Sequence, residues 1–198
     1  MNQLCYLNRM KQWSIDRIQE AWELASRLHD GQKYGGSRPN EKVEYLNHIG
    51  SVVLEIWNAL QFDNTIDAEL TMLCAILHDT IEDTGIKYEE VKTKFGKNVA
   101  DGVLALSKDE TIPDREAKML DSIQRIKKQP SEIWIVKMAD RITNLFSPPF
   151  YWDNKKKRAY QREALFIFDQ LKEAHPMLAE RLKRKIDEYD RFIENEKP

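Results

Sequence analysis

Residues 68–78 carry apolar side chains around almost the whole circumference of the helix that they are expected to form. A helix at the surface of a protein shows one apolar stripe, whereas a helix that is apolar all round has to be covered by neighbouring elements. This segment is therefore expected to lie at the centre of the fold. The chain has 198 residues, 41% of them apolar, so one domain can bury such a helix in a sizeable core.

Helical periodicity also dominates the rest of the chain, because apolar residues recur every three or four positions. The further expected helices cover residues 15–29, 45–60, 88–95, 97–107, a segment from about 111 to before Pro130, 132–146 with Ser131 as its cap, about 156–174 and about 176–193. Three of the seven glycines lie in residues 31–44, which are therefore expected to form a loop. No stretch alternates with a period of two, so no sheet is expected.

These patterns predict an all-α fold in which the whole chain is one helical bundle. Its core is expected over residues 15–147, with the C-terminal helices of residues 156–193 packed against it. Trp22, Trp57 and Trp134 are expected to be core residues, since each lies in a helix with apolar periodicity.

Charge and cysteine usage limit the partners of the chain. The net charge of −2 gives no global basic field, so neither DNA nor RNA is an expected partner. No apolar run approaches the roughly 18 residues that span a membrane, and the first residues lack the apolar part of a signal peptide. We expect a cytoplasmic protein without a membrane partner. Cys5 and Cys74 are far apart in the sequence, and Cys74 lies in an apolar run, which favours a reduced core thiol.

The central helix is followed by an unusual group of polar residues. Residues 77–85 read LHDTIEDTG and place one imidazole and three acids at His78, Asp79, Glu82 and Asp83. If the helix continues for a turn, Glu82 lies over His78 and Asp83 over Asp79. Charged groups at the end of a buried helix have to be paired or bound to a metal. The alternative is an ordinary helix end with capping residues and a core histidine.

A second polar stripe lies on the otherwise apolar segment IVKMADRITNLF. Lys137, Asp140 and Asn144 fall on one face, with Arg141 at its edge. A surface helix can carry such a stripe without any function. A mostly buried helix carries it only where the stripe faces a wet site or a metal, so this segment is a second candidate for the same site.

Two histidines and two aspartates on three expected helices form a candidate metal site. His48 joins His78, Asp79 and Asp140, and the long separations between them suit a site built from facing helices in a bundle. Two imidazoles and two carboxylates favour Mn, Fe, Zn or Co. Such an ion lowers the pKa of bound water and neutralises a phosphoryl oxygen.

The ordered motifs YLNHIG, LHDTIEDTG and KMADRITNL, with HDGQ near the start, resemble the HD superfamily of metal-dependent phosphohydrolases. The resemblance covers about residues 17–195 and is greatest to the alarmone hydrolases, which comprise the hydrolase half of the Rel/Spo stringent-response enzymes and their small relatives. It implies an all-helical HD bundle, a Mn²⁺ cofactor and release of pyrophosphate from the 3′ position of (p)ppGpp or (p)ppApp.

The resemblance also implies roles for individual residues. The implied metal ligands are His48, His78, Asp79 and Asp140. Glu82 and Asp83 are implied to act on the attacking water. The candidate substrate contacts are Tyr34, Lys108, Lys137, Arg141, Asn144 and Ser147.

One loop departs from the pattern of the family. Tyr34 stands where the family usually has an arginine that stacks on guanine, and Gly35 stands where it has a lysine. We therefore expect relaxed base specificity. Another small nucleotide, such as NADPH with its 2′-phosphate, and a non-catalytic nucleotide-sensing module remain alternatives.

Overall fold

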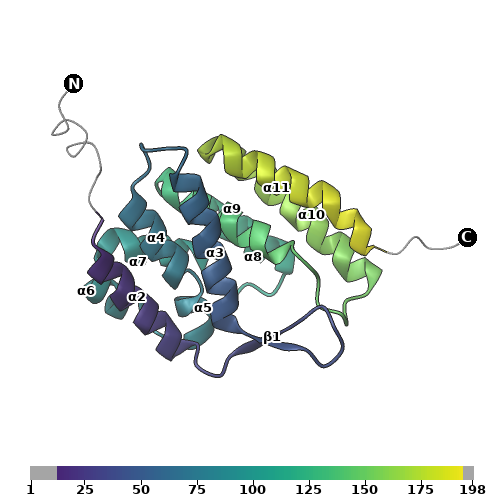
Figure 1. Ribbon diagram of the computed structural model, residues 1–198, viewed down its shortest axis with the longest axis horizontal. Coiled ribbons are helices and arrows are strands. Elements are labelled where there is room, and N and C mark those ends of the chain that lie inside the picture. Colours follow the sequence, from purple (N-terminus) through teal and green to yellow (C-terminus); the bar gives the residue numbers. More distant parts are fainter. Residues whose placement is uncertain (1–12, 194–198) are drawn as a thin grey trace, which may run out of the picture.

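A computed structural model of the protein describes residues 13–193, and the interpretation of Cys5 lies outside these residues. Figure 1 shows helices packed in a bundle, with a small hairpin at one edge. The helices are α2 (Ile15–Leu28), α3 (Tyr45–Leu60), α4 (Ala68–Leu77), α5 (Thr80–Thr84), α6 (Tyr88–Phe95), α7 (Lys97–Leu106), α8 (Arg115–Ile126), α9 (Ser131–Asn144), α10 (Asn154–Leu171) and α11 (Pro176–Glu188), with single 3-10 turns η1 (Lys172–Ala174) and η2 (Tyr189–Phe192). The prediction of an all-α fold is confirmed.

Helix α4 is the centre of the bundle. Every residue of its last two turns, 71–77, is buried, and α2, α3, α7 and α9 pack around it. The carboxylate of Asp67 caps its start by accepting a hydrogen bond from Leu70 N at 3.1 Å. Cys74 is a buried free thiol, and burial raises its pKa. The predictions of a covered central helix and a reduced core thiol at Cys74 are confirmed.

The last two helices lie side by side and pack on α9 (Figure 1). Their inner faces bury Leu171, Leu178 and Leu182 without exposed surface. Helix α9 is therefore enclosed between α3 and α4 on one side and this pair on the other. That position explains why α9 is apolar around most of its circumference.

The segment of residues 31–44 contains a hairpin, so the prediction of a loop without any sheet is wrong in detail. Strands β1 (Lys33–Gly35) and β2 (Lys42–Glu44) pair antiparallel, with Tyr34 opposite Val43. In the described part of the chain this is the whole sheet. Strands of three residues are too short to show an alternating pattern, which explains why the sequence did not reveal them.

Two further expectations need correction. Trp57 is 54% exposed and Trp22 is 38% exposed, so neither is a core residue, while Trp134 is half-buried. Trp57 lies on the outer side of α3, whose inner side buries Ile49, Val52 and Ile56. Ser131 is the first residue of α9 rather than its cap, because Pro130 occupies the capping position.

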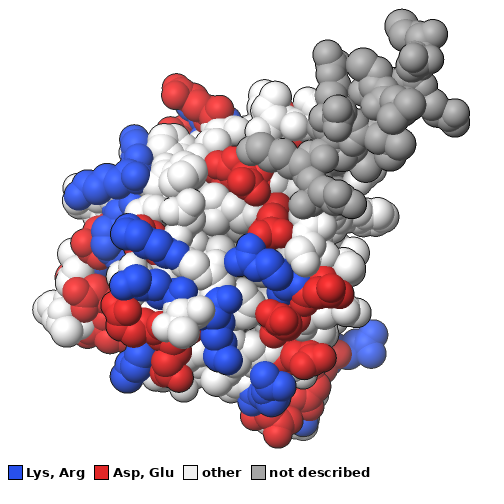
Figure 2. Space-filling view, turned by 90° about the vertical axis from the view of Figure 1, so that its left-hand side faces the viewer, with Lys and Arg blue, Asp and Glu red and all other residues white. Residues whose placement is uncertain are grey.

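Charged side chains of both signs are interspersed over the face formed by the left-hand side of Figure 1 (Figure 2). Such a mixture does not create a single-sign field on this face. Among residues 13–193, none of the helices combines the length and apolar character that crossing a membrane requires.

Candidate metal centre

Three helices bring two imidazoles and a carboxylate together inside the bundle. His48 lies on α3, His78 follows the last residue of α4, and Asp140 lies on α9. The two histidine Nε2 atoms are 3.2 Å apart, and His48 Nε2 is 3.5 Å from Asp140 Oδ1. All three side chains are buried, and their ligand atoms lie within 4.8 Å of one another. This is a group that could hold a divalent metal ion.

The tautomer of His78 suits a metal ligand. Its Nδ1 lies 2.8 Å from the carbonyl oxygen of Ala75 and donates a hydrogen bond to it. In a neutral imidazole the other nitrogen then has a free lone pair, and Nε2 faces the cluster. Metal-binding histidines are commonly oriented by such a bond.

Asp79 lies between two helices, directly after the expected end of the central helix. Helix α4 stops at Leu77, and Asp79 becomes the N-terminal cap position of the short helix α5. This turn places Asp79 Oδ2 2.9 Å from His78 Nε2 and 3.7 Å from His48 Nε2. The hydroxyl of Tyr45 donates a hydrogen bond to the same oxygen at 2.5 Å. Asp79 therefore lies beside the three-residue cluster and is the candidate fourth ligand.

The electrostatics of the cluster favour a cation. Burial lowers the pKa of His78, but the charges of Asp79 and Asp140 outweigh burial and raise this pKa to about 9. Burial opposes ionisation of Asp140, yet Lys137 and the two histidines lower its pKa to about 2. The pKa of His48 is lowered by burial and by His78. A divalent ion would displace the proton from His78, and with both imidazoles then neutral the carboxylates of Asp79 and Asp140 would compensate the charge of the ion.

The polar stripe of α9 faces this cluster. Lys137 Nζ lies 3.0 Å from Asp140 Oδ2, and Asn144 Nδ2 donates to Asp140 Oδ1 at 2.5 Å. Lys137 is only 5% exposed, so the stripe is not a solvated surface. The Lys137 ammonium and the Asn144 amide therefore fix the orientation of the Asp140 carboxylate.

The two acids of α5 have different partners. Glu82 accepts hydrogen bonds from Lys108 Nζ at 2.7 Å and from Lys108 N at 2.8 Å. Asp83 Oδ2 accepts one from Gln32 Nε2 at 3.0 Å. Burial and the nearby charge of Asp79 raise the pKa of Asp83 above its ordinary value. Asp83 therefore binds a proton more readily than a free aspartate does.

The remaining candidate substrate contacts differ in their partners and exposure. The Tyr34 hydroxyl accepts a hydrogen bond from Asn47 Nδ2 at 2.9 Å, and its ring meets the ring of Tyr45 edge-on at 6.3 Å. Arg141 instead points to α10, where it pairs with Glu163 at 2.6 Å. Ser147 is exposed beyond the end of α9. The structure thus brings Tyr34 toward the site and directs Arg141 away from it.

Three residues near the centre were given no role in the site from the sequence, although two of them belong to the HDGQ motif. Tyr45 binds Asp79, Gln32 binds Asp83, and His29 contacts both Tyr45 and Gln32. Tyr45 precedes His48 by three positions, so helical spacing already places it on the same face of α3. Gln32 gives no such signal, because its partner is 51 residues away.

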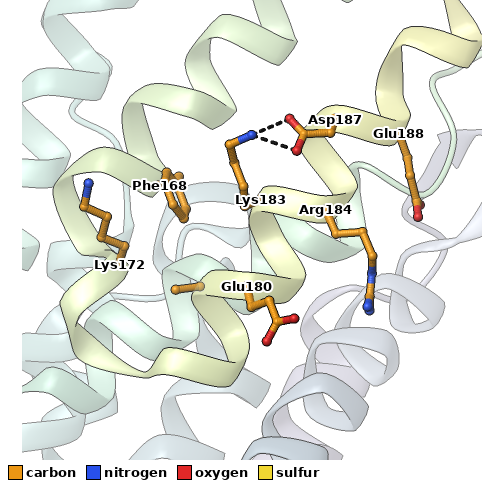
Figure 3. A pocket seen from close by; sticks show the side chains of 8 residues that line it. Phe168, Lys172, Glu180, Lys183, Arg184, Asp187 and Glu188 are labelled. Atoms are coloured by element: carbon orange, nitrogen blue, oxygen red, sulfur yellow. Dashed lines mark hydrogen bonds and ion pairs between the residues drawn. The ribbon is translucent and has the colours of Figure 1, made fainter.

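A surface hollow between α10 and α11 contains none of the candidate ligands (Figure 3). Phe168 on α10 and Lys172 at the start of η1 line it, and Lys183 pairs with Asp187 along α11 at 2.5 Å. The candidate ligands lie at the buried cluster instead.

The chain resembles known proteins over most of its length. It is 28% identical over 169 residues to guanosine-3′,5′-bis(diphosphate) 3′-pyrophosphohydrolase MESH1 of Xenopus tropicalis, covering 83% of this chain and 90% of that protein. The Homo sapiens protein of the same name is 29% identical, with 84% and 91% covered. Bifunctional (p)ppGpp synthase/hydrolase SpoT of Escherichia coli (strain K12) is 28% identical over 88% of this chain, which spans only 24% of SpoT.

The fold is also found in a solved structure, described as a metazoan ortholog of SpoT that hydrolyzes ppGpp. It superposes with a TM-score of 0.71 at 23% sequence identity and covers 91% of this chain and 97% of that chain. The model of the HD domain family matches residues 21–177, which include all of the candidate ligands. The chain therefore belongs to the HD domain family.

Proposed function

We propose that this protein is a metal-dependent hydrolase of nucleotide phosphoesters, which releases pyrophosphate from the 3′ position of (p)ppGpp or its adenine counterpart (p)ppApp. The observation that supports this most is the buried cluster of His48, His78 and Asp140 with Asp79 beside it. The names of its relatives, one of them matched over 90% of its length, favour the alarmone as the substrate.

His48, His78, Asp79 and Asp140 would hold the cofactor, for which we propose Mn²⁺. When bound, a divalent ion of this kind supplies a water of lowered pKa and neutralises phosphoryl charge. Tyr45, Lys137 and Asn144 fix the orientation of the two carboxylates through the hydrogen bonds described above. Ligands oriented in this way lose little freedom when the ion binds.

Asp83 and Glu82 are the proposed groups that act on the attacking water. Burial and the nearby charge of Asp79 raise the pKa of Asp83, which makes it a better proton acceptor than an ordinary aspartate. Glu82 is held by two donors of Lys108, which fixes its position beside Asp83. Lys108 and Lys137 are the proposed phosphate contacts, because their ammonium groups lie beside the acids of the site.

Base recognition is proposed to involve Tyr34 on the hairpin. A tyrosine ring stacks on any purine, whereas an arginine adds charge and further hydrogen-bond donors. Gly35, the next residue, offers no side chain. We therefore propose that guanine and adenine substrates differ in kcat/KM by less than about tenfold.

A panel of substrates tests this function. Purified protein with Mn²⁺ is incubated with guanine and adenine alarmones, NADPH and simple nucleotides, and released pyrophosphate and phosphate are measured separately. We expect pyrophosphate from both alarmones and none with Asp140→Asn, which controls for contaminating phosphatases. If phosphate were released from NADPH and no pyrophosphate from either alarmone, NADPH would be the substrate in place of the alarmones. Nucleotide binding without any product would mean a sensing module.

A further inference from the structure

A tight turn after α2 carries two polar side chains toward the metal centre. Helix α2 ends at Leu28, His29 is its C-terminal cap, and Gln32 N donates to His29 O at 3.0 Å. Gly31 has a φ of +72°, a conformation that L side chains rarely adopt. The turn thereby brings the side chains of His29 and Gln32 within hydrogen-bonding distance of each other.

These two residues form a chain of contacts that reaches both α5 and α3. His29 Nδ1 lies 2.6 Å from Gln32 Oε1, and Gln32 Nε2 donates to Asp83 Oδ2 at 3.0 Å. The ring of His29 also stacks on Tyr45, with centroids 4.9 Å apart and planes 21° apart. Tyr45 in turn donates to Asp79. One histidine thus contacts the partners of both carboxylates.

The charge on Asp83 fixes the direction of this hydrogen-bond chain. An ionised carboxylate only accepts hydrogen bonds, so the amide nitrogen of Gln32 has to face it. The amide oxygen then faces His29, whose Nδ1 has to carry the proton. A neutral imidazole has a single N–H, and His29 Nε2 is buried without a partner in the described structure. In the Nδ1–H tautomer Nε2 carries no hydrogen, so no N–H of His29 is buried without an acceptor.

We propose that His29 and Gln32 are positioning residues of the catalytic centre. Gln32 orients Asp83, and His29 holds Gln32 through Nδ1–H while its ring holds Tyr45 against Asp79. The inference rests on the proposed function, in which Asp83 acts on the attacking water. The inference has two branches that can be tested separately. The hydrogen bond of His29 to Gln32 orients Asp83, and the stacking of its ring on Tyr45 orients the metal ligand Asp79.

Substitution of Gln32 tests the first branch. Gln32→Met keeps the size of the side chain but removes both hydrogen bonds. Misplacing a reacting group by about 1 Å costs on the order of 100-fold. We expect kcat to fall by about 10- to 100-fold, with KM and Mn²⁺ content unchanged. A kcat equal to that of the wild type would overturn the inference.

Two substitutions of His29 separate the branches. His29→Asn retains a donor near the position of Nδ1 but removes the ring, so kcat at saturating Mn²⁺ is kept and Mn²⁺ affinity falls. His29→Phe retains the ring but removes the donor, so Mn²⁺ affinity is kept and kcat falls as in Gln32→Met. His175→Asn is the matched control, because His175 is also buried but caps α11. Equal loss of both properties in both His29 variants would indicate a merely structural role.

A measurement without turnover separates this inference from the proposed function. The protein has four histidines, and long-range ¹H–¹⁵N NMR on the metal-free protein reports the tautomer of each. We expect His29 in the Nδ1–H form, and its loss in Gln32→Met. The Nε2–H form in the wild type would overturn the inference. If the wild type hydrolyses no nucleotide, the proposed function fails. The tautomer of His29 and the Mn²⁺ affinities of the variants still test whether His29 and Gln32 position Asp83 and Tyr45.

Discussion

Removal of Glu163 should destabilise the protein strongly, because this residue compensates a buried charge next to the metal centre. The Arg141 side chain is 4% exposed, and its Nη2 pairs with Glu163 Oε1 at 2.6 Å. Its Nε and Nη1 have no hydrogen-bond partner in the described structure, and its guanidinium lies 4.2 Å from the ring centroid of Tyr160. Breaking a buried pair by removing one partner costs about 3–5 kcal/mol.

The assay is thermal and urea unfolding of Glu163→Ala. For a chain of this size, 1 kcal/mol corresponds to about 2–4 °C, so we expect the Tm to fall by about 6–20 °C. Glu89→Ala is the matched control, because Glu89 pairs with Lys92 on the surface, where such a pair contributes less than about 1 kcal/mol. A loss below about 1 kcal/mol in Glu163→Ala would refute the reasoning, since Arg141 would then not depend on Glu163.

The same pair predicts a dependence of stability on pH. Burial raises the pKa of Glu163, but the charges of Arg141 and Arg115 outweigh burial and lower the pKa below its ordinary value. A carboxylate with a lowered pKa in the folded state stabilises the protein above its ordinary pKa of about 4.3, and this contribution is lost as the pH falls through the folded-state value. The difference in stability between wild type and Glu163→Gln should therefore be largest at neutral pH and shrink in acid.

Three other variants test the site. Asp140→Ala should lose the metal, measured by elemental analysis, while its helical circular dichroism persists; full metal content would remove Asp140 from the ligands. Glu82→Gln should keep the metal and lose turnover, and an unchanged kcat would favour Asp83 alone as the group that acts on water. Tyr34→Ala should weaken guanine and adenine substrates alike in kcat/KM, and a guanine preference beyond about 100-fold that survives this change would mean that the base is read elsewhere.

The helices follow from the sequence because their apolar spacing reflects burial on one face. The central position of α4 was predictable for the same reason, since Leu73, Cys74 and Leu77 leave no polar side. Spacing alone does not say what covers a helix. Trp57 continues the apolar pattern of α3, yet it is 54% exposed.

The site was predictable in its charges but not in its pairings. His48, His78 and Asp140 stand out as polar residues on buried helices. The partner of Arg141 lies 22 residues away on α10, and only tertiary packing decides that its guanidinium turns there. The end of the central helix near His78 was expected, whereas the separate short helix α5 after Asp79 was not. The three-residue spacing of Tyr45 and His48 could have predicted that both face the site, whereas strands as short as those of the hairpin leave no periodic pattern.

We propose that one divalent ion, held by the ligands of the buried cluster, is required for alarmone hydrolysis. The most direct test strips the protein of metal and titrates it with Mn²⁺ while pyrophosphate release from ppGpp is measured. Because the cluster offers a single set of ligands, we expect no activity without metal and a linear rise that ends at about one ion per chain. Undiminished pyrophosphate release from the metal-free protein in the presence of a chelator would contradict this account.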